Sequence, residues 1–380
     1  MSVVRDLAYV QWDPIAAIAP SHVISLWSRV GGFKTTGLDR LLWDEKRLFE
    51  HWGPIAMIVL TEDYPLFRSL MDRYPESLTS SWGSNRKRAR KFMTKHVDLR
   101  NGILKQLEGG PMQLNQFTGY IRTQRDLDGW GSGSEVSHML HHMQMCGDVM
   151  VVGHEGNQNV WGLSKGFLPN RVFKTELSEE EFECKAAERS VRALGTASSR
   201  EIHYYFVRGR YQNLKNALGR LQEESKIHPI HVSGLGDKEE RYIHDSDLTL
   251  LDSLATGSWH PRTTLIAPFD NLISGRRRTN RLFGFDYVHE QFLPVEKRKY
   301  GTFVLPILRG ERLIGRADLL MDRKKGKLLV KSLYAEPGAP EEPEVPREIV
   351  ETLERLSTFL GGSEVEYSAR VPPSWKGHLS

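Results

Sequence analysis

Cysteines, long apolar runs and secretion signals are scarce or missing in this sequence. Its 380 residues contain only two cysteines, Cys146 and Cys184, which are too few for a disulfide framework and are typical of a reducing compartment. No segment reaches the length of apolar sequence that spans a bilayer, and no signal peptide precedes Val3. We therefore expect a soluble cytoplasmic protein that does not bind a membrane.

Several enzyme motifs are also missing, and their absence argues against whole classes of function. The sequence has no P-loop, no GxGxxG after a strand, no GxSxG and no HExxH. This argues against a nucleotide-driven motor, a dinucleotide enzyme, a serine hydrolase and a zinc protease. His138 and His142 lie four residues apart, but no acidic or cysteine pair completes a metal site at a familiar spacing. We expect neither a metal nor a cofactor.

The composition that remains is that of a globular protein. Hydrophobic residues make up 39% of the chain and charged residues 26%, which suffices for a buried core. A chain of 380 residues predicts two or more domains. The net charge is only +4, so local clusters of Lys and Arg are more informative about partners than the total.

Hydrophobic periodicity predicts three helices in the first third of the chain. They cover residues 16–29, after Pro14, residues 38–52, and a strongly basic segment at residues 84–108. Further on, a helix at 136–146 is followed by a predicted hairpin at 149–163. A second helix, at 211–221, precedes a predicted hairpin at 227–244. A helix followed by a β-hairpin is typical of winged-helix units, relatives of the helix-turn-helix.

Beyond residue 259 the sequence changes to short β-type runs and a final helix near residues 347–360. The prediction is an α+β fold, with tandem winged-helix (helix-turn-helix) units followed by a C-terminal β-barrel-like domain. The expected boundaries are 1–98, 99–172 and 173–256 for three winged-helix units and 257–380 for the barrel-like domain with its terminal helix.

The segment "QWD" near the start of the chain has two interpretations. In a strand, Gln11 and Asp13 point to one side and Trp12 to the other. Asp13 also precedes Pro14, which suits an N-cap with proline at the first helical position. In the functional interpretation, the amide and the carboxylate hold one water and face a cationic transition state. Both interpretations can hold at once, because one carboxylate oxygen of Asp13 can cap the helix while the other points outward.

Three blocks of sequence resemble one enzyme family. They are "VQWDPIAAIAPSHVISLWSRVGGF", "LDRLLWDEKRLFEHWGP" and a long C-terminal block that contains "LFGFDY", "KRKYG" and "VLPIL". Together they resemble the winged-helix DNA glycosylases of the AlkZ/YcaQ type, from near the first residue to about Leu329. The resemblance implies tandem winged helices and a β-barrel around a DNA channel. It also implies activity on N7-alkylated purines, including interstrand crosslinks.

The family's catalytic motif is a glutamine, an apolar residue, and then glutamine or aspartate. Gln11, Trp12 and Asp13 fit the aspartate version, which resembles the YcaQ branch with its broader range of lesions. Members of the family carry a longer segment before the motif, so we expect either that the start codon is placed too late or that the first winged-helix unit is incomplete.

The chemistry of glycoside cleavage suits these residues. Asp13 would stabilise the oxocarbenium-like sugar and activate a water, while Gln11 would orient that water. No lysine stands out as a Schiff-base former, so we expect a monofunctional enzyme. We also expect the protein to be a monomer and to associate with the nucleoid in the cytoplasm.

A crosslinked guanine cannot flip freely out of its duplex, so double-stranded DNA carrying alkylated bases should lie in an open, basic trough. The clusters "RKRARK" and "GRRRTNR" alone are best explained as solvated helix faces, but beside winged-helix units they favour phosphate contacts. The candidate DNA-binding residues, which include the hairpin tip at 154–158, are Arg29, Arg86, Lys87, Arg88, Arg90, Lys91, His154, Asn157, Gln158, Arg276, Arg277 and Arg278.

Two other functions remain open at this point. Tandem winged helices also occur in transcription regulators, which bind an operator and cleave nothing. An inactive DNA-binding relative is the second alternative. The Gln-x-Asp pair and the long C-terminal β block favour the glycosylase.

Overall fold

The computed structural model describes residues 1–13, 15, 17–53, 55–77, 83–118, 134–235, 239–259, 261–367 and 370–376. The chain forms two compact units. The first contains Met1–Tyr9, Thr36–Ile230 and Glu240–Asp245, and the second contains Val10–Thr35, His231–Glu239 and Ser246–Ser380. Each of the four predicted domains contains one sheet, and the predicted boundaries between them stay a prediction.

Three small sheets have one topology in common. In each, a lone strand pairs with the second strand of a later hairpin, and the hairpin's first strand lies at the far edge. The sheets are β1-β3-β2 (Tyr9–Gln11, Ala56–Leu60, Leu48–Trp52), β4-β6-β5 (Met112–Gln113, Gln158–Leu163, Val149–Glu155) and β7-β9-β8 (Thr196–Ser198, Arg241–His244, Ile227–Ile230).

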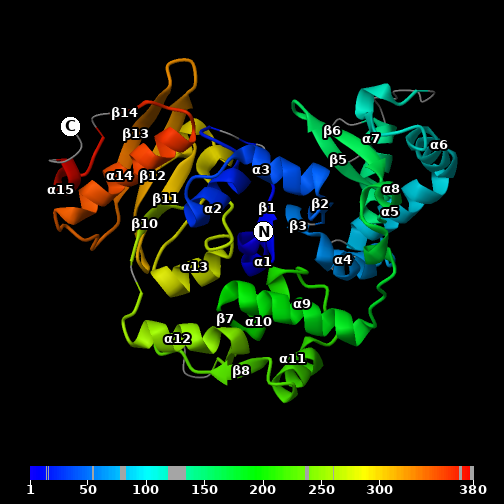
Figure 1. Cartoon of the computed structure of the whole chain (residues 1–380), viewed down its shortest axis with the longest axis horizontal. Coiled ribbons are helices and arrows are strands. Elements are labelled where there is room, and N and C mark those ends of the chain that lie inside the picture. Colours follow the sequence, from blue (N-terminus) through cyan, green and yellow to red (C-terminus); the bar gives the residue numbers. More distant parts are fainter. Residues whose placement is uncertain are drawn as a thin grey trace. The chain divides into compact units, whose positions relative to one another are not determined.

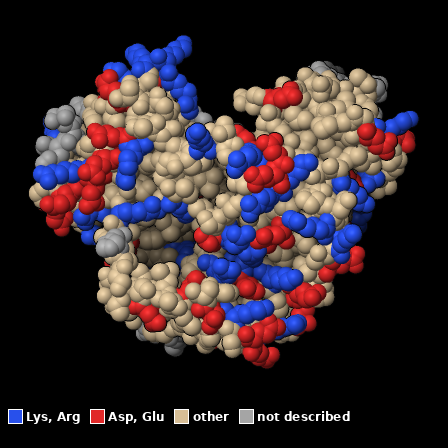
Figure 2. Space-filling view, in the orientation of Figure 1, with Lys and Arg blue, Asp and Glu red and all other residues tan. Residues whose placement is uncertain are grey.

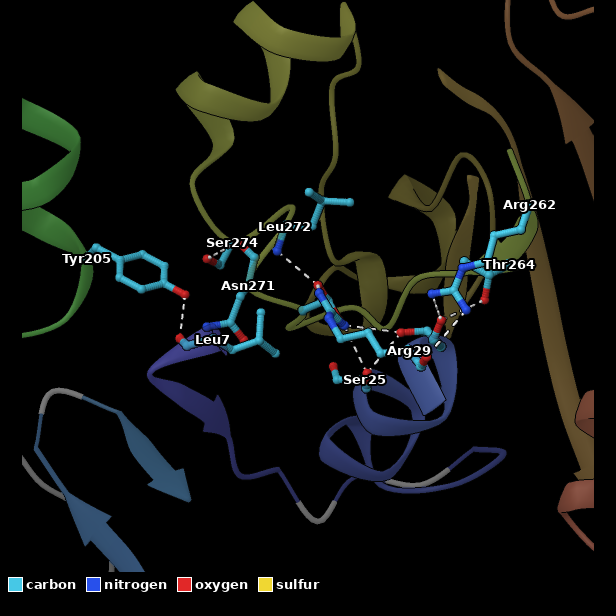
Figure 3. A network of polar contacts seen from close by, with 11 residues as sticks. Leu7, Ser25, Arg29, Tyr205, Arg262, Thr264, Asn271, Leu272 and Ser274 are labelled. Atoms are coloured by element: carbon cyan, nitrogen blue, oxygen red, sulfur yellow. Dashed lines mark hydrogen bonds and ion pairs between the residues drawn. The ribbon is translucent and has the colours of Figure 1, made fainter. Parts of the chain in front are cut away.

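The helices of the first unit precede and follow these strands. The longest of them begins where Ser178 and Glu181 exchange hydrogen bonds in a capping box, which satisfies two amides of its first turn. Tyr205 Oη donates to the carbonyl of Leu7 at 2.8 Å and so fixes the first helix of the chain (Figure 3). The helices are α1 (Ser2–Leu7), α3 (Thr35–Asp39), the π-helix Arg40–Asp44, α4 (Tyr64–Met71), α5 (Gly83–Lys95), α6 (Val97–Leu107), α7 (Glu135–Met145), α8 (Ser164–Phe167), α9 (Glu179–Leu194), α10 (Ser199–Tyr205) and α11 (Leu214–Glu223).

The second unit is built on a curled five-stranded sheet in the order β10-β11-β12-β13-β14 (Figure 1). Neighbouring strands are antiparallel except β13 and β14, and bulges near Leu308 and Leu319 interrupt the register, which bends a sheet. Its elements are α2 (Ser21–Val30), α12 (Leu248–Ala255), β10 (Thr263–Leu265), α13 (Arg276–Phe283), β11 (Val304–Arg309), β12 (Arg312–Asp322), β13 (Lys327–Ala335), α14 (Glu344–Phe359), β14 (Glu364–Tyr367) and α15 (Pro373–Lys376).

One core joins the beginning and the end of the sequence in this unit. Ile24 and Trp27 of α2 pack in one cluster with sheet residues such as Leu305, with Leu353 of α14 and with Trp375. Burial of each such side chain stabilises the fold by about 1.5–3 kcal/mol. Trp375 also contacts the backbone at Gly315, where a Cβ would lie 2.7 Å from the indole ring. The helix that follows the "QWD" segment is therefore part of the core of the curled sheet.

The helix–hairpin predictions are confirmed for α7 with β5 and β6, and for α11 with β8 and β9, although α11 begins at Leu214 and not at 211. The meander of β11, β12 and β13 and the helix α14 are confirmed as well. The predicted helix at 84–108 is two helices, because His96 leaves the helical region with φ −114° and ψ 38°.

Two predicted helices were wrong in part. The segment 16–29 becomes helical only at Ser21, because Pro20 cannot lie inside a helix and disfavours helix at the residue before it. The segment 38–52 contains α3 and the π-helix but ends in strand β2. Leu48 and Phe49 in that strand are fully buried, and a short apolar run of this kind does not distinguish a helix from a buried strand.

Candidate active site and nucleic-acid interface

Asp13 lies just after β1 and is buried, with 8% of its surface exposed. One carboxylate oxygen accepts a hydrogen bond from the amide of Ile15 at 3.2 Å, and the other accepts one from Ser21 Oγ at 3.3 Å. Burial raises the pKa of this carboxyl, while the two hydrogen bonds act in the opposite direction. The side chain is therefore a fixed, poorly solvated carboxyl group with a raised proton affinity.

The backbone around Asp13 is fixed by His22 of α2. The amide of Asp13 donates to His22 Nδ1 at 3.5 Å, and the His22 ring stacks on Trp12 with 6.0 Å between ring centroids. Because Nδ1 accepts this hydrogen bond, a neutral His22 carries its proton on Nε2. Trp12 and Asp13 are thus both attached to the first turn of α2.

The structure does not support Asp13 as the N-cap of a helix. The N-cap of α2 is Pro20, and the Asp13 side chain accepts its hydrogen bond from this helix through the hydroxyl of Ser21. Pro14, the expected first helical residue, lies outside the described residues. Gln11 ends β1 and is half-buried, and in the described part of the chain its side-chain amide makes no hydrogen bond. It is therefore available to bind a water or a substrate.

A buried ion pair holds the other end of α2. Arg29 donates to both carboxylate oxygens of Asp270, at 2.6 and 2.8 Å, and to the carbonyl of Ser25 at 2.9 Å (Figure 3). Burial favours the neutral form of Asp270, but the charge and hydrogen bonds of Arg29, with the amide of Leu272, outweigh it and lower its pKa. Arg29 was predicted as a DNA contact, and that role stays a prediction for a side chain already engaged in this pair.

The basic cluster at 86–91 lies on helix α5. Lys87, Arg88 and Lys91 are exposed, Arg86 is half-buried, and Arg90 forms an ion pair with Glu76. An open hollow of about 590 Å³ lies beside this helix, and its lining among the described residues consists of Lys87, Arg90, Lys91, Thr94 and Lys95. The hollow is therefore basic, and it includes Lys95, which sequence reasoning did not single out.

The second basic cluster begins helix α13. Arg276 and Arg277 are exposed, whereas Arg278 is half-buried. Arg281, later in the same helix, pairs with Glu239 at 2.5 Å. The exposed arginines at the start of α13 are therefore the members of this cluster best placed to meet a ligand.

The predicted hairpin tip has two kinds of residue. Asn157 and Gln158 are exposed beside Gly156, which turns the chain with φ +61°. His154, in contrast, lies at 2.7 Å from the buried carboxylate of Glu50 and contacts the edge of the Trp43 ring. His154 thus fastens the hairpin to β2, while the tip itself is open to solvent.

A further basic turn was not predicted as a site. Blue side chains gather over the turn that joins β12 and β13 in Figure 2, where Lys324 and Lys325 are exposed. Arg323 beside them donates to the carbonyl of Ile18 at 2.7 Å. The run "RKKGK" was the available signal, because it places four cations within five residues.

The histidines of α7, at positions 138, 141 and 142, are half-buried in the first unit. His142 Nδ1 lies 2.6 Å from Tyr74 Oη, and burial lowers the pKa of His142 to about 4. No group of three His, Cys, Asp or Glu residues suited to a metal ion occurs among the residues that the structure describes. A search of the same residues for a helix with the length and apolarity of a membrane span also finds none.

Comparisons with known proteins agree with this architecture. The chain is similar to a solved structure, the Streptomyces sahachiroi DNA glycosylase AlkZ, with a TM-score of 0.64 and 14% sequence identity. The match covers 97% of this chain and 92% of that chain, and at this identity it shows a common fold. The family model described as "DNA glycosylase AlkZ-like" matches residues 4–359, so the chain belongs to the AlkZ-like family of DNA glycosylases.

Proposed function

We propose that this DNA glycosylase hydrolyses the N-glycosidic bond of N7-alkylated purines in double-stranded DNA, including those in interstrand crosslinks. The observation that supports the proposal best is the environment of Asp13. Its carboxylate is buried and accepts two hydrogen bonds that fix it, and its pKa is raised. A buried carboxylate with a raised pKa is a stronger base than an exposed one and interacts more strongly with a nearby cation.

The reaction requires little help for the leaving group. A purine alkylated at N7 is cationic, so the bond to C1′ breaks to give a neutral base and an oxocarbenium-like sugar. We propose that Asp13 stabilises this positive sugar and then accepts a proton from the water whose oxygen bonds to C1′. Gln11, whose amide makes no other hydrogen bond in the described part of the chain, would orient that water.

We further propose that the three strand–hairpin sheets belong to winged-helix units. Their common topology and the helices that precede each hairpin support this assignment. The proposed DNA contacts are exposed residues of the hairpin tip and of two helices: Asn157 and Gln158, then Lys87, Arg88 and Lys91 of α5, and Arg276 and Arg277 of α13. We also propose five DNA contacts whose side chains are half-buried or already paired within the protein, and which would have to reach DNA while they keep those contacts: Arg29, Arg86, Arg90, His154 and Arg278.

Base release from a duplex that carries N7-methylguanine tests the proposal. Products are treated with hot alkali, which breaks the strand at abasic sites. We expect release by the wild type and a loss of about 10²- to 10⁴-fold in Asp13→Asn, the range for removal of a general base. Asp252→Asn is the matched control, because Asp252 is an exposed aspartate of the same unit.

The same assay separates the other functions. Strands should stay intact without alkali, because a monofunctional enzyme leaves the sugar in place. Equal release by wild type and Asp13→Asn would remove Asp13 from the mechanism. Specific retention of one undamaged sequence, with no release of any alkylated base, would favour a regulator.

A further inference from the structure

Two arginines in the loop after α10 have no acidic partner. Neither Arg208 nor Arg210 forms an ion pair with any residue that the structure describes, and the Nε atom of each is buried without a hydrogen-bond acceptor. Arg208 makes one polar contact, with Tyr9 Oη at 3.2 Å, and lies 5.9 Å from the centre of the Tyr9 ring. Buried guanidinium groups normally have an anion beside them, so this loop lacks a counter-charge.

The backbone of the loop is shaped to present both side chains. Arg208 has φ +50° and Gly209 has φ +85°, and the amide of Gly209 closes the turn on the carbonyl of His203 at 2.7 Å. A left-handed conformation at a non-glycine residue is strained and persists where the surroundings impose it, often at binding sites. The turn therefore holds Arg208 and Arg210 close together at the expense of local strain.

A third nitrogen-bearing side chain approaches from the end of β2. His51 is 4% exposed, and its Nδ1 atom is buried without a partner. A Cβ built on Gly53 would lie 3.5 Å from His51 Nε2 and 3.7 Å from both terminal nitrogens of Arg210. The ring and the guanidinium thus border one small space above Gly53, which the absence of a side chain leaves open.

The electrostatics of this space favour an anion. Burial, together with the neighbouring charge of Arg208, lowers the pKa of Arg210 to about 10. Burial also lowers the pKa of His51 to about 3, so the ring is neutral and offers one N–H donor. Arg208, Arg210 and Gly53 are each half-buried, so a ligand can reach them from solvent. An anion here would offset the repulsion between the arginines and accept their unused hydrogen bonds.

We propose that Arg208, Arg210 and His51 form a phosphate pocket that holds one phosphodiester group of the DNA backbone. The identity of the ligand as DNA rests on the proposed function. The planar fork of Arg210 matches two phosphate oxygens, and a glycine at position 53 permits the close approach of the backbone. Tyr9, which contacts Arg208, belongs to the strand that ends at Gln11.

The test measures binding of the full-length protein to undamaged duplex DNA at a series of salt concentrations. We expect Arg210→Gln to bind about 10- to 100-fold more weakly than the wild type, the effect of losing hydrogen bonds to a charged group. The slope of log K against log salt should also fall by about 0.9, the value for one phosphate contact. Arg210→Lys should keep the slope and lose part of the affinity. Arg200→Gln, an exposed arginine on α10, is the matched control and should show a smaller effect.

Thermal unfolding without DNA separates a binding role from a structural one. Removal of an unpaired buried charge should leave the melting temperature of Arg210→Gln equal to or above that of the wild type. Inorganic phosphate should raise the melting temperature of the wild type and not that of Arg210→Gln. A lower melting temperature in Arg210→Gln, with no response of the wild type to phosphate, would show a structural arginine and overturn the proposal.

Two other results would also overturn it. Unchanged affinity and slope in Arg210→Gln would exclude a phosphate contact. A response to inorganic phosphate with unchanged DNA binding would assign the pocket to a free anion. Base release is not a readout in these experiments, so failure of the glycosylase proposal would leave the binding result intact.

Discussion

Replacement of Arg29 by methionine should lower the free energy of unfolding of the second unit, by an amount that follows from the ion pair between Arg29 and Asp270. Asp270 is fully buried, and two of the hydrogen bonds to its carboxylate come from Arg29. The Leu272 amide, at 2.9 Å, and the side chain of Ser25 would remain as donors, but neither carries a charge. Removal of one partner from a buried ion pair typically costs about 3–5 kcal/mol, because the other charge stays buried and uncompensated. We expect a loss of this size in the free energy of unfolding of Arg29→Met.

The pH dependence of that loss follows from the pKa of Asp270. In the wild type this pKa is lowered from the ordinary value of 3.8, so the pair contributes stability above that value and loses it as the pH falls below it. In Arg29→Met the charge of Arg29 no longer opposes burial, so the pKa of Asp270 should rise above its value in the wild type. The deficit of the variant should therefore be largest near neutral pH and should shrink as acid protonates Asp270.

Urea unfolding of the wild type, Arg29→Met, Asp270→Asn and the double variant measures both effects. The double variant should lose less than the sum of the single variants, with a coupling of about 1–3 kcal/mol. Arg347→Met, an exposed arginine on α14, is the control and should stay within about 0.5 kcal/mol of the wild type. A deficit below about 1 kcal/mol in Arg29→Met, or one that does not change with pH, would refute this reasoning. A smaller salt dependence of DNA binding with unchanged stability would instead assign Arg29 to the phosphate backbone.

Two further predictions concern Asp13 and Gly301. Burial raises the pKa of Asp13, so the single-turnover rate of N7-methylguanine release, after subtraction of spontaneous depurination, should decline in acid with an apparent pKa above the ordinary value of 3.8. An apparent pKa at or below 3.8 would contradict the assignment of Asp13 as the base. Gly301→Ala should lower the free energy of unfolding by more than about 2 kcal/mol, because a Cβ at this residue, where φ is +147°, would lie 2.3 Å from the carboxyl group of Asp318. Gly32→Ala is the control and should be tolerated, because the space around Gly32 is open. Equal urea midpoints for the two variants would disprove the clash.

The sequence allowed prediction of those elements whose signals are local. Met139 and Met143 recur at helical spacing before Gly147, and the turn at Gly156 separates two apolar runs, so α7 and its hairpin followed directly. Leu48 and Phe49 gave no such indication, because their strand is defined by pairing with β3, and pairing depends on residues elsewhere in the chain.

The candidate site divides in the same way. Gln11 and Asp13 are two residues apart and share a motif, so they could be proposed from the sequence. The contacts of Asp13 with Ser21 and His22 could not, because the expected helix began at residue 16 and would have placed both residues in its second turn, whereas they lie in the first turn of α2. His51 and Arg210 lie far apart in sequence and are brought together only by folding, which is why neither was a candidate.

The core that α2 shares with α14 and Trp375 has a consequence for synthesis of the protein. The ribosome makes α2 among the first thirty residues, but the partners that share its core emerge much later, from Leu265 of β10 to Trp375 near the end of the chain. At usual rates of translation that interval is on the order of tens of seconds. Throughout it, Ile24 and Trp27 must wait for their neighbours, and a nascent chain released before Trp375 would lack the contacts that seat the helix behind Asp13.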